Sequence, residues 1–567
     1  MRLVDARRLT GPTHLARRPL VVVELALDEG EALADVVAIY RRELWRLRAA
    51  RGFAPEVEVL VRAHRGGATV AYEAPIDVML ASAEASEWAA LSAVEALAGR
   101  AALPLEPRRA EIAAILARDA SPRLLALDDE ARRRGVPLLW DDEIVSVGTG
   151  RGSKAFPRHE LPAVADVAWD TVRAIPVALV TGTNGKTTSS RLLARMAREA
   201  SLRVALASTD GIEVGSETLE DGDWTGPGAA RIALRRDDVE LAVLETARGG
   251  ILRRGLAVET CDAALITNVS ADHLGLYGID DIAAMAEVKG VVAHAVRSGG
   301  TAVLNAHDPL LVALAPSLSC HVTFFADLEG DGAAARPVIE AALARGGRAV
   351  VAEGGAVVAV QAGERVAIAR IADLPITFGG AARYNVQNVL GAVATARALG
   401  LPDAAIAAAL RAFGMEDNPG RGQVVVRRGI TVVLDFGHNA QGVRAVMSFV
   451  ASLRGPQGRL QVVTGSPGDR TDDEIEAVAR AIHECSPARV YLRELGDYLR
   501  GRDPGEVPAL FARAFRALGM PDARFVLASS EVDAVAQAFA AAAPGDVIVV
   551  LVHLDKAGVH AFLDAQA

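Results

Sequence analysis

Between residues 170 and 415, short apolar runs alternate with helical patterns, and this alternation constrains the fold more than any other feature of the chain. Continuous apolar runs of this kind are typical of strands buried on both faces of a parallel sheet. The alternation therefore predicts a doubly wound α/β sheet. Strand-like segments in residues 318–378 interrupt this alternation, so we expect a β-rich insert or edge there. The five runs are AIPVALV, RVALAST, VELAVLET, CDAALITN and GGTAVLN, which begin at residues 174, 203, 239, 261 and 299.

Different patterns flank this region and divide the chain of 567 residues into three predicted domains. Residues 1–165 combine β-branched, alternating segments with helical periods, which predicts an α+β domain. A stretch rich in glycine, proline and charge, residues 147–164, leads to its boundary. Residues 416–567 again alternate apolar strands with helices, so we expect a Rossmann-like domain after a central domain at 166–415.

Charge and cysteine content narrow the functional classes. The net charge is −10 and the sequence pI is near 5.7, which argues against nucleic acid as the main partner. Cys261, Cys320 and Cys485 lie far apart without a CxxC pair, so we expect neither a disulfide framework nor a zinc site, and a cytoplasmic location. The apolar run near the N-terminus is short and interrupted, which predicts neither a signal peptide nor a membrane span.

The segment TGTNGKTTSS, residues 181–190, joins a predicted strand to a predicted helix. Its glycines let backbone N–H groups point toward one anion, and the N-terminus of the helix adds its positive end. Lys186 is expected to reach the β- and γ-phosphates of a nucleotide, and the Thr187 hydroxyl to hold Mg²⁺. Val180 stands where the common GxxxxGK[ST] pattern has its first glycine, and the alternative is a glycine-rich turn without a ligand.

Further candidate side chains follow later strands. Glu245 ends one strand, where a carboxylate beside a phosphate loop can bind a metal or, alternatively, cap a helix. After the next strand come Asp272 and His273; the imidazole can ligate a metal and the acid can orient it, and a structural histidine is the alternative. Lys289 lies among apolar residues of a predicted helix, where burying a lysine is costly unless it has a task.

Lysine is rare in this chain. Only Lys154, Lys186, Lys289 and Lys556 occur, and the other members of the 61 Lys and Arg side chains are arginines. A lysine retained in such a background is a candidate for a task that arginine cannot perform. The alternative, for any one of them, is a surface residue that survives by chance.

The order of these motifs resembles the Mur ligase superfamily. Within it, the sequence is most similar to the Mur-like half of cyanophycin synthetases, over about residues 176–560. The N-terminal segment LTGPTHLARRPLVVVELAL also resembles the N-terminal domain of those enzymes, but no ATP-grasp domain stands between the two parts. The segments that carry the likeness are GTNGKTT, LETARGGILRRGL, NVSADHLGL, VKGVVAHAV, VLNAHDP, NPGRGQ, LDFGHNAQG and SPGDRTDDEI.

The resemblance implies an ATP site, two Mg²⁺ sites and places for the substrates. Lys289 matches a lysine that many members of the superfamily carry as a carbamate. The expected catalytic residues are Lys186, Glu245, His273 and Lys289, and the expected metal ligands are Thr187, Glu245 and His273. The expected nucleotide-binding residues are Gly182, Thr183, Asn184, Gly185, Lys186, Thr187, Thr188, Asn305, Asn388, Arg421 and Asp435, and the substrate-binding residues are Thr225, Arg231 and His438.

The activity that this resemblance implies is ATP-dependent amide ligation. Phosphoryl transfer turns a carboxylate, which is a poor electrophile, into an acyl phosphate, and an amine then displaces phosphate. The expected partners are a small-molecule or peptide carboxylate, an amine, and further copies of the chain in a homo-oligomer. Two alternatives stay open: a nucleotide-binding subunit that acts with a separate ATP-grasp ligase, and a small-molecule kinase or NTPase.

Overall fold

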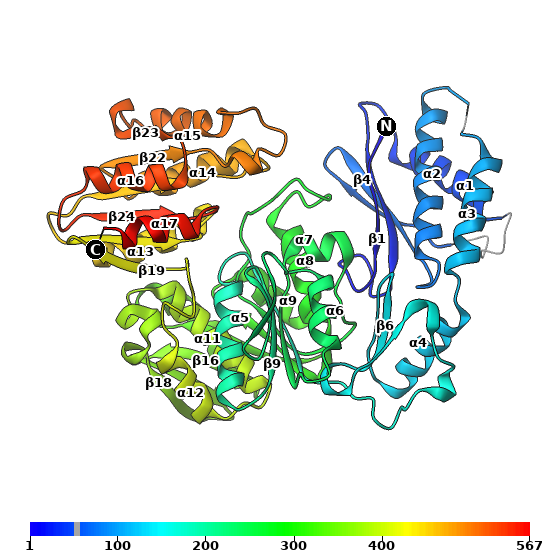
Figure 1. Cartoon of the computed structure of the whole chain (residues 1–567), viewed down its shortest axis with the longest axis horizontal. Helices are drawn as coiled ribbons and strands as arrows, with labels where there is room; N and C mark the ends of the chain where they lie inside the picture. Colours follow the sequence, from blue (N-terminus) through cyan, green and yellow to red (C-terminus); the bar gives the residue numbers. More distant parts are fainter. Residues whose placement is uncertain (50–56, 102, 567) are drawn as a thin grey trace.

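The computed structural model describes residues 1–49, 57–101 and 103–566. Figure 1 shows three groups of elements side by side, with the central group between the N-terminal group and the C-terminal group. Each group is built around its own sheet. Within the described part of the chain, no helix is both long and apolar enough to cross a lipid bilayer.

The N-terminal group contains an antiparallel sheet in the order β1-β2-β4-β3. One face of the sheet packs on α1 and α2, because the alternate side chains on that face are apolar. This arrangement confirms the predicted α+β class. A small three-stranded sheet follows. The bounds are β1 (Arg2–Leu9), β2 (Leu20–Ala26), α1 (Leu33–Arg48), β3 (Leu60–His64), β4 (Gly67–Glu73), α2 (Met79–Leu97), α3 (Leu105–Asp119), α4 (Pro122–Arg134), β5 (Leu138–Trp140), β6 (Ile144–Val147) and β7 (Lys154–Pro157).

The central sheet has eleven strands in the order β11-β10-β9-β12-β8-β13-β14-β15-β16-β17-β18. The strands from β9 to β16 in this order are parallel, and the five predicted apolar runs are β8, β9, β12, β13 and β14. The expected β-rich edge is present, with β17 and β18 antiparallel at one end. The bounds are β8 (Val177–Thr181), β9 (Val204–Ser208), β10 (Gly211–Val214), β11 (Glu217–Asp221), β12 (Leu241–Glu245), β13 (Cys261–Ile266), β14 (Val296–Asn305), β15 (His321–Asp327), β16 (Arg348–Glu353), β17 (Ala356–Gln361) and β18 (Glu364–Arg370).

Helices cover both faces of this sheet, so the prediction of a doubly wound fold is confirmed. One apolar core joins the sheet to α5, α11 and α12, and a second core on the other face joins it to α6, α7, α8, α9 and α10. The chain leaves β8 toward β9 on one side and later adds β13 on the other, so β8 lies at the switch point where such sheets bind ligands. The bounds are α5 (Lys186–Glu199), α6 (Pro227–Arg235), α7 (Arg248–Arg254), α8 (Ile282–His294), α9 (Pro309–Leu314), α10 (Arg336–Ala344), α11 (Arg383–Ala398) and α12 (Asp403–Ala412).

The C-terminal sheet has the order β19-β20-β24-β21-β22-β23, and all of its strands except β19 are parallel. Helices α13 to α15 pack on one face, and α16 and α17 pack on the other, which confirms the Rossmann-like prediction. The bounds are β19 (Gln423–Arg427), β20 (Ile430–Asp435), α13 (Ala440–Leu453), β21 (Leu460–Thr464), α14 (Asp472–His483), β22 (Arg489–Arg493), α15 (Glu506–Ala517), β23 (Phe525–Ala528), α16 (Glu531–Ala541), β24 (Val547–Leu551) and α17 (Lys556–Asp564).

The N-terminal group docks on the central group through the turn that follows β1. The backbone N–H of Thr10 donates to the carbonyl of Arg254 at 2.7 Å, and the N–H of Leu256 donates to the carbonyl of Pro12 at 2.9 Å. Gly11 lies between these bonds, where a Cβ atom would lie 2.0 Å from the carbonyl oxygen of Leu256. Glycine is therefore required for this close approach of two backbones.

Candidate active site

The turn between β8 and α5 forms a cradle in which two positions require glycine. Gly182 has φ +148° and Gly185 has φ +84°, so both lie outside the usual range of L-residues. A Cβ atom on Gly182 would lie 1.9 Å from Oγ1 of Thr267, and one on Gly185 would lie 2.1 Å from Oδ1 of Asn388. Because α5 begins at Lys186, its free N–H groups and the positive end of its dipole face this turn.

The segment after β13 braces the same turn. The backbone N–H of Asn184 donates to Oδ1 of Asn268 at 2.9 Å, and Nδ2 of Asn268 donates back to the carbonyl of Asn184 at 3.0 Å. Oγ1 of Thr183 accepts a hydrogen bond from the backbone N–H of Ser270 at 3.0 Å. Asn268 therefore fixes the phosphate loop, a role that its position at a strand end did not indicate from sequence.

A carboxylate and two hydroxyls meet beside the loop. Glu245, at the end of β12, is 3% exposed. Its Oε1 accepts from the hydroxyl of Thr187 at 3.2 Å and from that of Thr209 at 2.9 Å, and its Oε2 accepts from the Thr209 N–H at 3.3 Å. These are hard oxygen ligands of the kind that Mg²⁺ uses together with phosphate oxygens. The structure brings Thr187 and Glu245 together as expected, and it adds Thr209.

Two lysine amines lie next to the loop. Nζ of Lys186 donates to the Thr183 carbonyl at 3.0 Å, three residues back along the loop. Nζ of Lys289, on α8, donates to the Gly182 carbonyl at 2.8 Å, and this lysine is 4% exposed. Burial, and secondarily the charge of Lys186, hold the pKa of Lys289 well below its usual value. The buried amine is therefore stabilised in its neutral form, which is a nucleophile.

Asp272 and His273 face the C-terminal domain. Asp272 forms an ion pair with Arg470 at 2.9 Å and lies 3.5 Å from Nε2 of His438, so its partners differ from the predicted one. Nδ1 of His273 lies 3.9 Å from Oδ2 of Asp469 and has no hydrogen-bond partner among the described residues. Burial and the charge of Arg470 lower the pKa of His273 to about 3. A neutral imidazole with a free nitrogen is the form that can ligate a metal.

Few protein side chains at this site could bind a metal ion. Across residues 1–49, 57–101 and 103–566, no three His, Cys, Asp or Glu side chains form a ready-made metal centre. Glu245 and Thr187 suit an ion that is shared with a nucleotide, since Mg²⁺ commonly takes one or two protein ligands beside phosphate oxygens and water. His273 fits a second ion less directly, because Asp469, which faces its Nδ1 at 3.9 Å, belongs to another domain.

The other expected nucleotide residues fall into two places. Asn305 donates to the Thr267 carbonyl at 2.9 Å, and Asn388 packs against Gly185, so both lie under the phosphate loop. Thr188, on the first turn of α5, accepts from Nδ2 of Asn418 at 3.2 Å. Arg421 and Asp435 belong to the connection into the C-terminal domain and to the end of β20. There, the Arg421 guanidinium lies 4.9 Å from the ring centre of Phe436, and burial raises the pKa of Asp435 to about 6.

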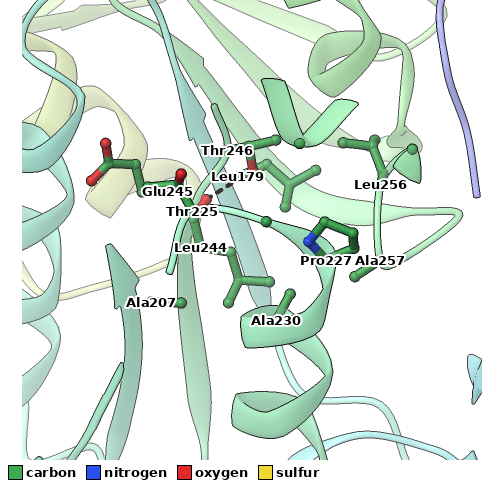
Figure 2. A pocket seen from close by; sticks show the side chains of 13 residues that line it. Leu179, Ala207, Thr225, Pro227, Ala230, Leu244, Glu245, Thr246, Leu256 and Ala257 are labelled. Carbon is green, nitrogen blue, oxygen red and sulfur yellow. Dashed lines mark hydrogen bonds between the residues drawn. The ribbon is translucent and has the colours of Figure 1, made fainter. Parts of the chain in front are cut away.

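Two of the predicted substrate-binding residues, Thr225 and Arg231, lie in different places. Thr225 lines a small pocket that reaches Glu245, and Figure 2 shows Thr225 and Glu245 on one side of it and Leu256 and Ala257 on the other. Arg231 does not line this pocket; its Nη2 donates to Oγ1 of Thr10 at 2.7 Å, at the boundary with the N-terminal domain. The lining residues are Leu179, Ala207, Thr225, Gly226, Pro227, Ala230, Leu244, Glu245, Thr246, Gly250, Gly255, Leu256 and Ala257.

The C-terminal domain touches the phosphate loop itself. Nδ2 of Asn184 donates to Oδ1 of Asn439 at 3.1 Å and to Oε1 of Gln441 at 3.0 Å, and Nδ2 of Asn439 donates back to Oδ1 of Asn184 at 3.0 Å. Asn439 also caps α13. The N-terminus of α13 and that of α5 therefore meet across the loop, so the carboxyl edges of the two parallel sheets enclose one site between them.

Comparisons with known proteins agree with this geometry. The chain is 37% identical to the cyanophycin synthetase of Geminocystis herdmanii over 388 residues, which are 66% of this chain and 43% of that protein. It therefore spans less than half the length of this relative. It is 29% identical to a UDP-N-acetylmuramate–L-alanine ligase of Polaromonas over 383 residues, 65% of this chain and 72% of that protein.

The structural comparison shows the fold alone. E. coli FolC in complex with DHPP and ADP has a TM-score of 0.51 and 18% identity, covering 69% of this chain and 89% of that chain. Family models match in two adjoining parts: the Mur ligase middle domain over residues 180–396, and the Mur ligase glutamate ligase domain over residues 420–552. Through these two domains, of which the first holds the glycine cradle and the second contacts it, the chain belongs to the Mur ligase family.

Proposed function

We propose that this chain is an ATP-dependent carboxylate–amine ligase, which forms a peptide or isopeptide bond and releases ADP and phosphate. The observation that carries the proposal is the meeting of four features at the carboxyl ends of β8 and β12. They are the glycine cradle, the amine of Lys186, the Thr187–Glu245 pair and the buried amine of Lys289. The family relationship of the two domains supports the same reaction.

The cradle and Lys186 bind the phosphates of ATP in this proposal. Lys186 donates to its own loop in the structure, and its flexible four-carbon stem lets the ammonium turn toward a phosphate oxygen. There, it offsets the charge that develops on the transferred phosphoryl group. Glu245 and Thr187 would hold Mg²⁺, which supplies further charge neutralisation, and His273 is the candidate ligand of a second ion.

Two substrates complete the reaction. The acceptor carboxylate attacks the γ-phosphorus, the bond to ADP breaks, and an acyl phosphate forms. The amine then attacks the acyl carbon, loses a proton, and expels inorganic phosphate. Water would hydrolyse the acyl phosphate, so the contact of Asn184 with Asn439 and Gln441 serves to close the site during this step.

Lys289 is proposed to act as a carbamate. Its neutral amine attacks CO₂ and loses a proton, which leaves an anionic group anchored beside the Gly182 carbonyl. The low pKa of the amine favours this step, because only the unprotonated form is a nucleophile. The resulting anion would help to place the metal and the γ-phosphate. The carbon signal of a carbamate in NMR spectra of protein equilibrated with ¹³CO₂ tests this assignment.

The substrates are proposed to be an amino acid as the amine and a small molecule or peptide as the carboxylate. Thr225 lines the same pocket as Glu245, where it would contact the acceptor, and His438 of the C-terminal domain lies 3.5 Å from Asp272. We also propose a homo-oligomer in the cytoplasm. Mass photometry of the purified protein tests the assembly.

The test is ADP release with purified protein, Mg²⁺ and ATP across a panel of amino acids and short peptides, together with mass spectrometry of the products. A ligase releases ADP only when both a carboxylate and an amine are present, and the product mass equals that of their condensation. Lys186→Ala and Lys289→Ala should abolish turnover. Lys154→Ala is the matched control, because this lysine is exposed on β7.

Two results would contradict the proposal. A stable phosphorylated product without an amide would assign the site to a kinase. Nucleotide binding without turnover for any pair of substrates, restored by a separate ATP-grasp ligase, would assign the chain to a partner-dependent subunit.

A further inference from the structure

We propose that Lys556, the first residue of α17, is a positioning residue that holds the C-terminal domain onto the active site by pairing with Asp210. This inference rests on the proposed ligase function and names a contact that its closed state requires. Nζ of Lys556 donates to Oδ1 of Asp210 at 3.1 Å, although the two residues are 346 positions apart. Lys556 is 33% exposed and Asp210 23%, so solvent screens the pair only in part.

Asp210 lies next to three cationic side chains. Besides Lys556, it faces Arg191 of α5 at 3.0 Å and Arg421 of the interdomain connection at 3.8 Å. Burial favours the neutral acid, but these three cations outweigh it and keep the pKa of Asp210 below its ordinary value. The carboxylate is therefore charged at neutral pH, and the pair needs no change of protonation to form.

The three cations come from the central domain, the interdomain connection and the C-terminal domain. Arg191 stays with Asp210 in the central domain, whereas Lys556 arrives with the last helix of the C-terminal domain. The stem of Lys556 also packs beside the connection, since a Cβ atom on Gly420 would lie 3.1 Å from its Cε. Losing Lys556 therefore leaves Asp210 paired within its own domain, so the cost falls on domain closure and not on folding.

The pair lies one residue from the proposed metal set. Thr209 precedes Asp210, and both the hydroxyl and the N–H of Thr209 donate to Glu245. The hydroxyl of Thr209 also lies 3.1 Å from that of Thr187. A displacement of Asp210 would also displace Thr209, because the two residues are joined by one peptide unit. Thr209 would in turn shift the Glu245 carboxylate, to which it donates two hydrogen bonds. Closure of the C-terminal domain is thus coupled to the geometry around Glu245.

The test compares Lys556→Met with Lys154→Met, the matched loss of an exposed lysine. Small-angle scattering with a nonhydrolysable ATP analogue and Mg²⁺ reports closure without turnover, so the test succeeds or fails independently of the ligase assignment. We expect Lys556→Met to have a larger radius of gyration than wild type and a Kd for the ATP analogue raised about three- to tenfold, as for a partly buried ion pair. Urea unfolding should be unchanged.

Two further variants separate positioning from a general loss of charge. Lys556→Arg should restore most of the closure, because it keeps the cation. Asp210→Asn should weaken closure at least as much as Lys556→Met does, because Asp210 also faces Arg421, and the double variant should be no worse than Asp210→Asn alone. The proposal is overturned if Lys556→Met scatters and binds ATP like wild type, if Lys154→Met has the same effect, or if the effects of Asp210→Asn and Lys556→Met add.

Discussion

Replacement of Gly185 by alanine tests the phosphate cradle most directly. The residue has φ +84°, and a Cβ atom there would lie 2.1 Å from Oδ1 of Asn388. The left-handed conformation costs an L-residue about 1–2 kcal/mol, and overpacking against a buried side chain costs about 1–3 kcal/mol more. Asn388 cannot move away freely, because it is buried and its Nδ2 donates to Asn385 at 3.1 Å.

The total cost of Gly185→Ala is therefore about 2–5 kcal/mol. If the loop changes conformation to relieve the clash, the protein loses affinity for the nucleotide. If the loop keeps its conformation, the strain lowers the free energy of unfolding. Calorimetric titration with an ATP analogue and urea unfolding without nucleotide measure the two losses, and their sum should reach at least about 2 kcal/mol, equivalent to about thirtyfold in affinity.

Gly455→Ala is the control for this experiment. Gly455 is exposed, its φ is not positive, and no atom lies within 4 Å of its added Cβ. This variant should bind nucleotide and unfold like wild type. If Gly185→Ala also matched wild type in both measurements, the reasoning from the glycine cradle would be wrong.

Three further predictions concern stability. The pKa of Asp435 is raised to about 6, so ionisation of this group destabilises the folded protein as the pH rises from about 4 through 6. Between pH 4 and pH 8, the unfolding free energy of wild type should therefore fall by roughly 3 kcal/mol relative to that of Asp435→Asn, as measured by urea unfolding. Arg493→Met removes the cation that pairs with the buried Glu531, which keeps only its backbone N–H donors, and should lower the unfolding free energy by about 3–5 kcal/mol. Arg444→Met, in an exposed pair, should cost less than about 1 kcal/mol. Gly11→Ala forces a methyl group against a carbonyl oxygen of the central domain and should cost about 1–3 kcal/mol in urea unfolding, with faster proteolysis between the domains.

The strands of the central sheet could be predicted from the sequence because they are buried on both faces. Such strands appear as uninterrupted apolar runs, and all five predicted runs are strands of the sheet. In a parallel sheet, the residues that follow each strand gather at one edge. The proximity of Thr187 to Glu245, and of Lys289 to Gly182, could therefore be expected from their positions after β8, β12 and on the helix that follows β13.

Contacts between domains could not be predicted in this way, because spacing along the chain carries no information on domain orientation. Asp272 was expected to orient His273, yet it pairs with Arg470 across the domain boundary. The contact of Arg231 with Thr10 of the N-terminal domain could not be predicted either, and its expected role at the acceptor stays a prediction. The first strand, β1, carries three arginines in eight residues and has no apolar pattern; the sheet edge and a neighbouring domain stabilise it instead.

Three of the four lysines in this chain lie at the candidate site, whereas arginine supplies most other positive charges. Lys186, Lys289 and Lys556, three of only four lysines in a chain with 61 basic Lys and Arg residues, each donate to an acceptor at or beside the phosphate loop. A guanidinium has five donors in a fixed plane and keeps its charge, so it suits the surface ion pairs that arginine makes throughout this chain. Lys289 has one acceptor in a buried environment that disfavours charge, and there an arginine would leave donors unpaired and could not become a neutral nucleophile. The proposed reaction explains these lysines, because it needs a compact amine that can lose its proton or an ammonium that can turn from one acceptor to another.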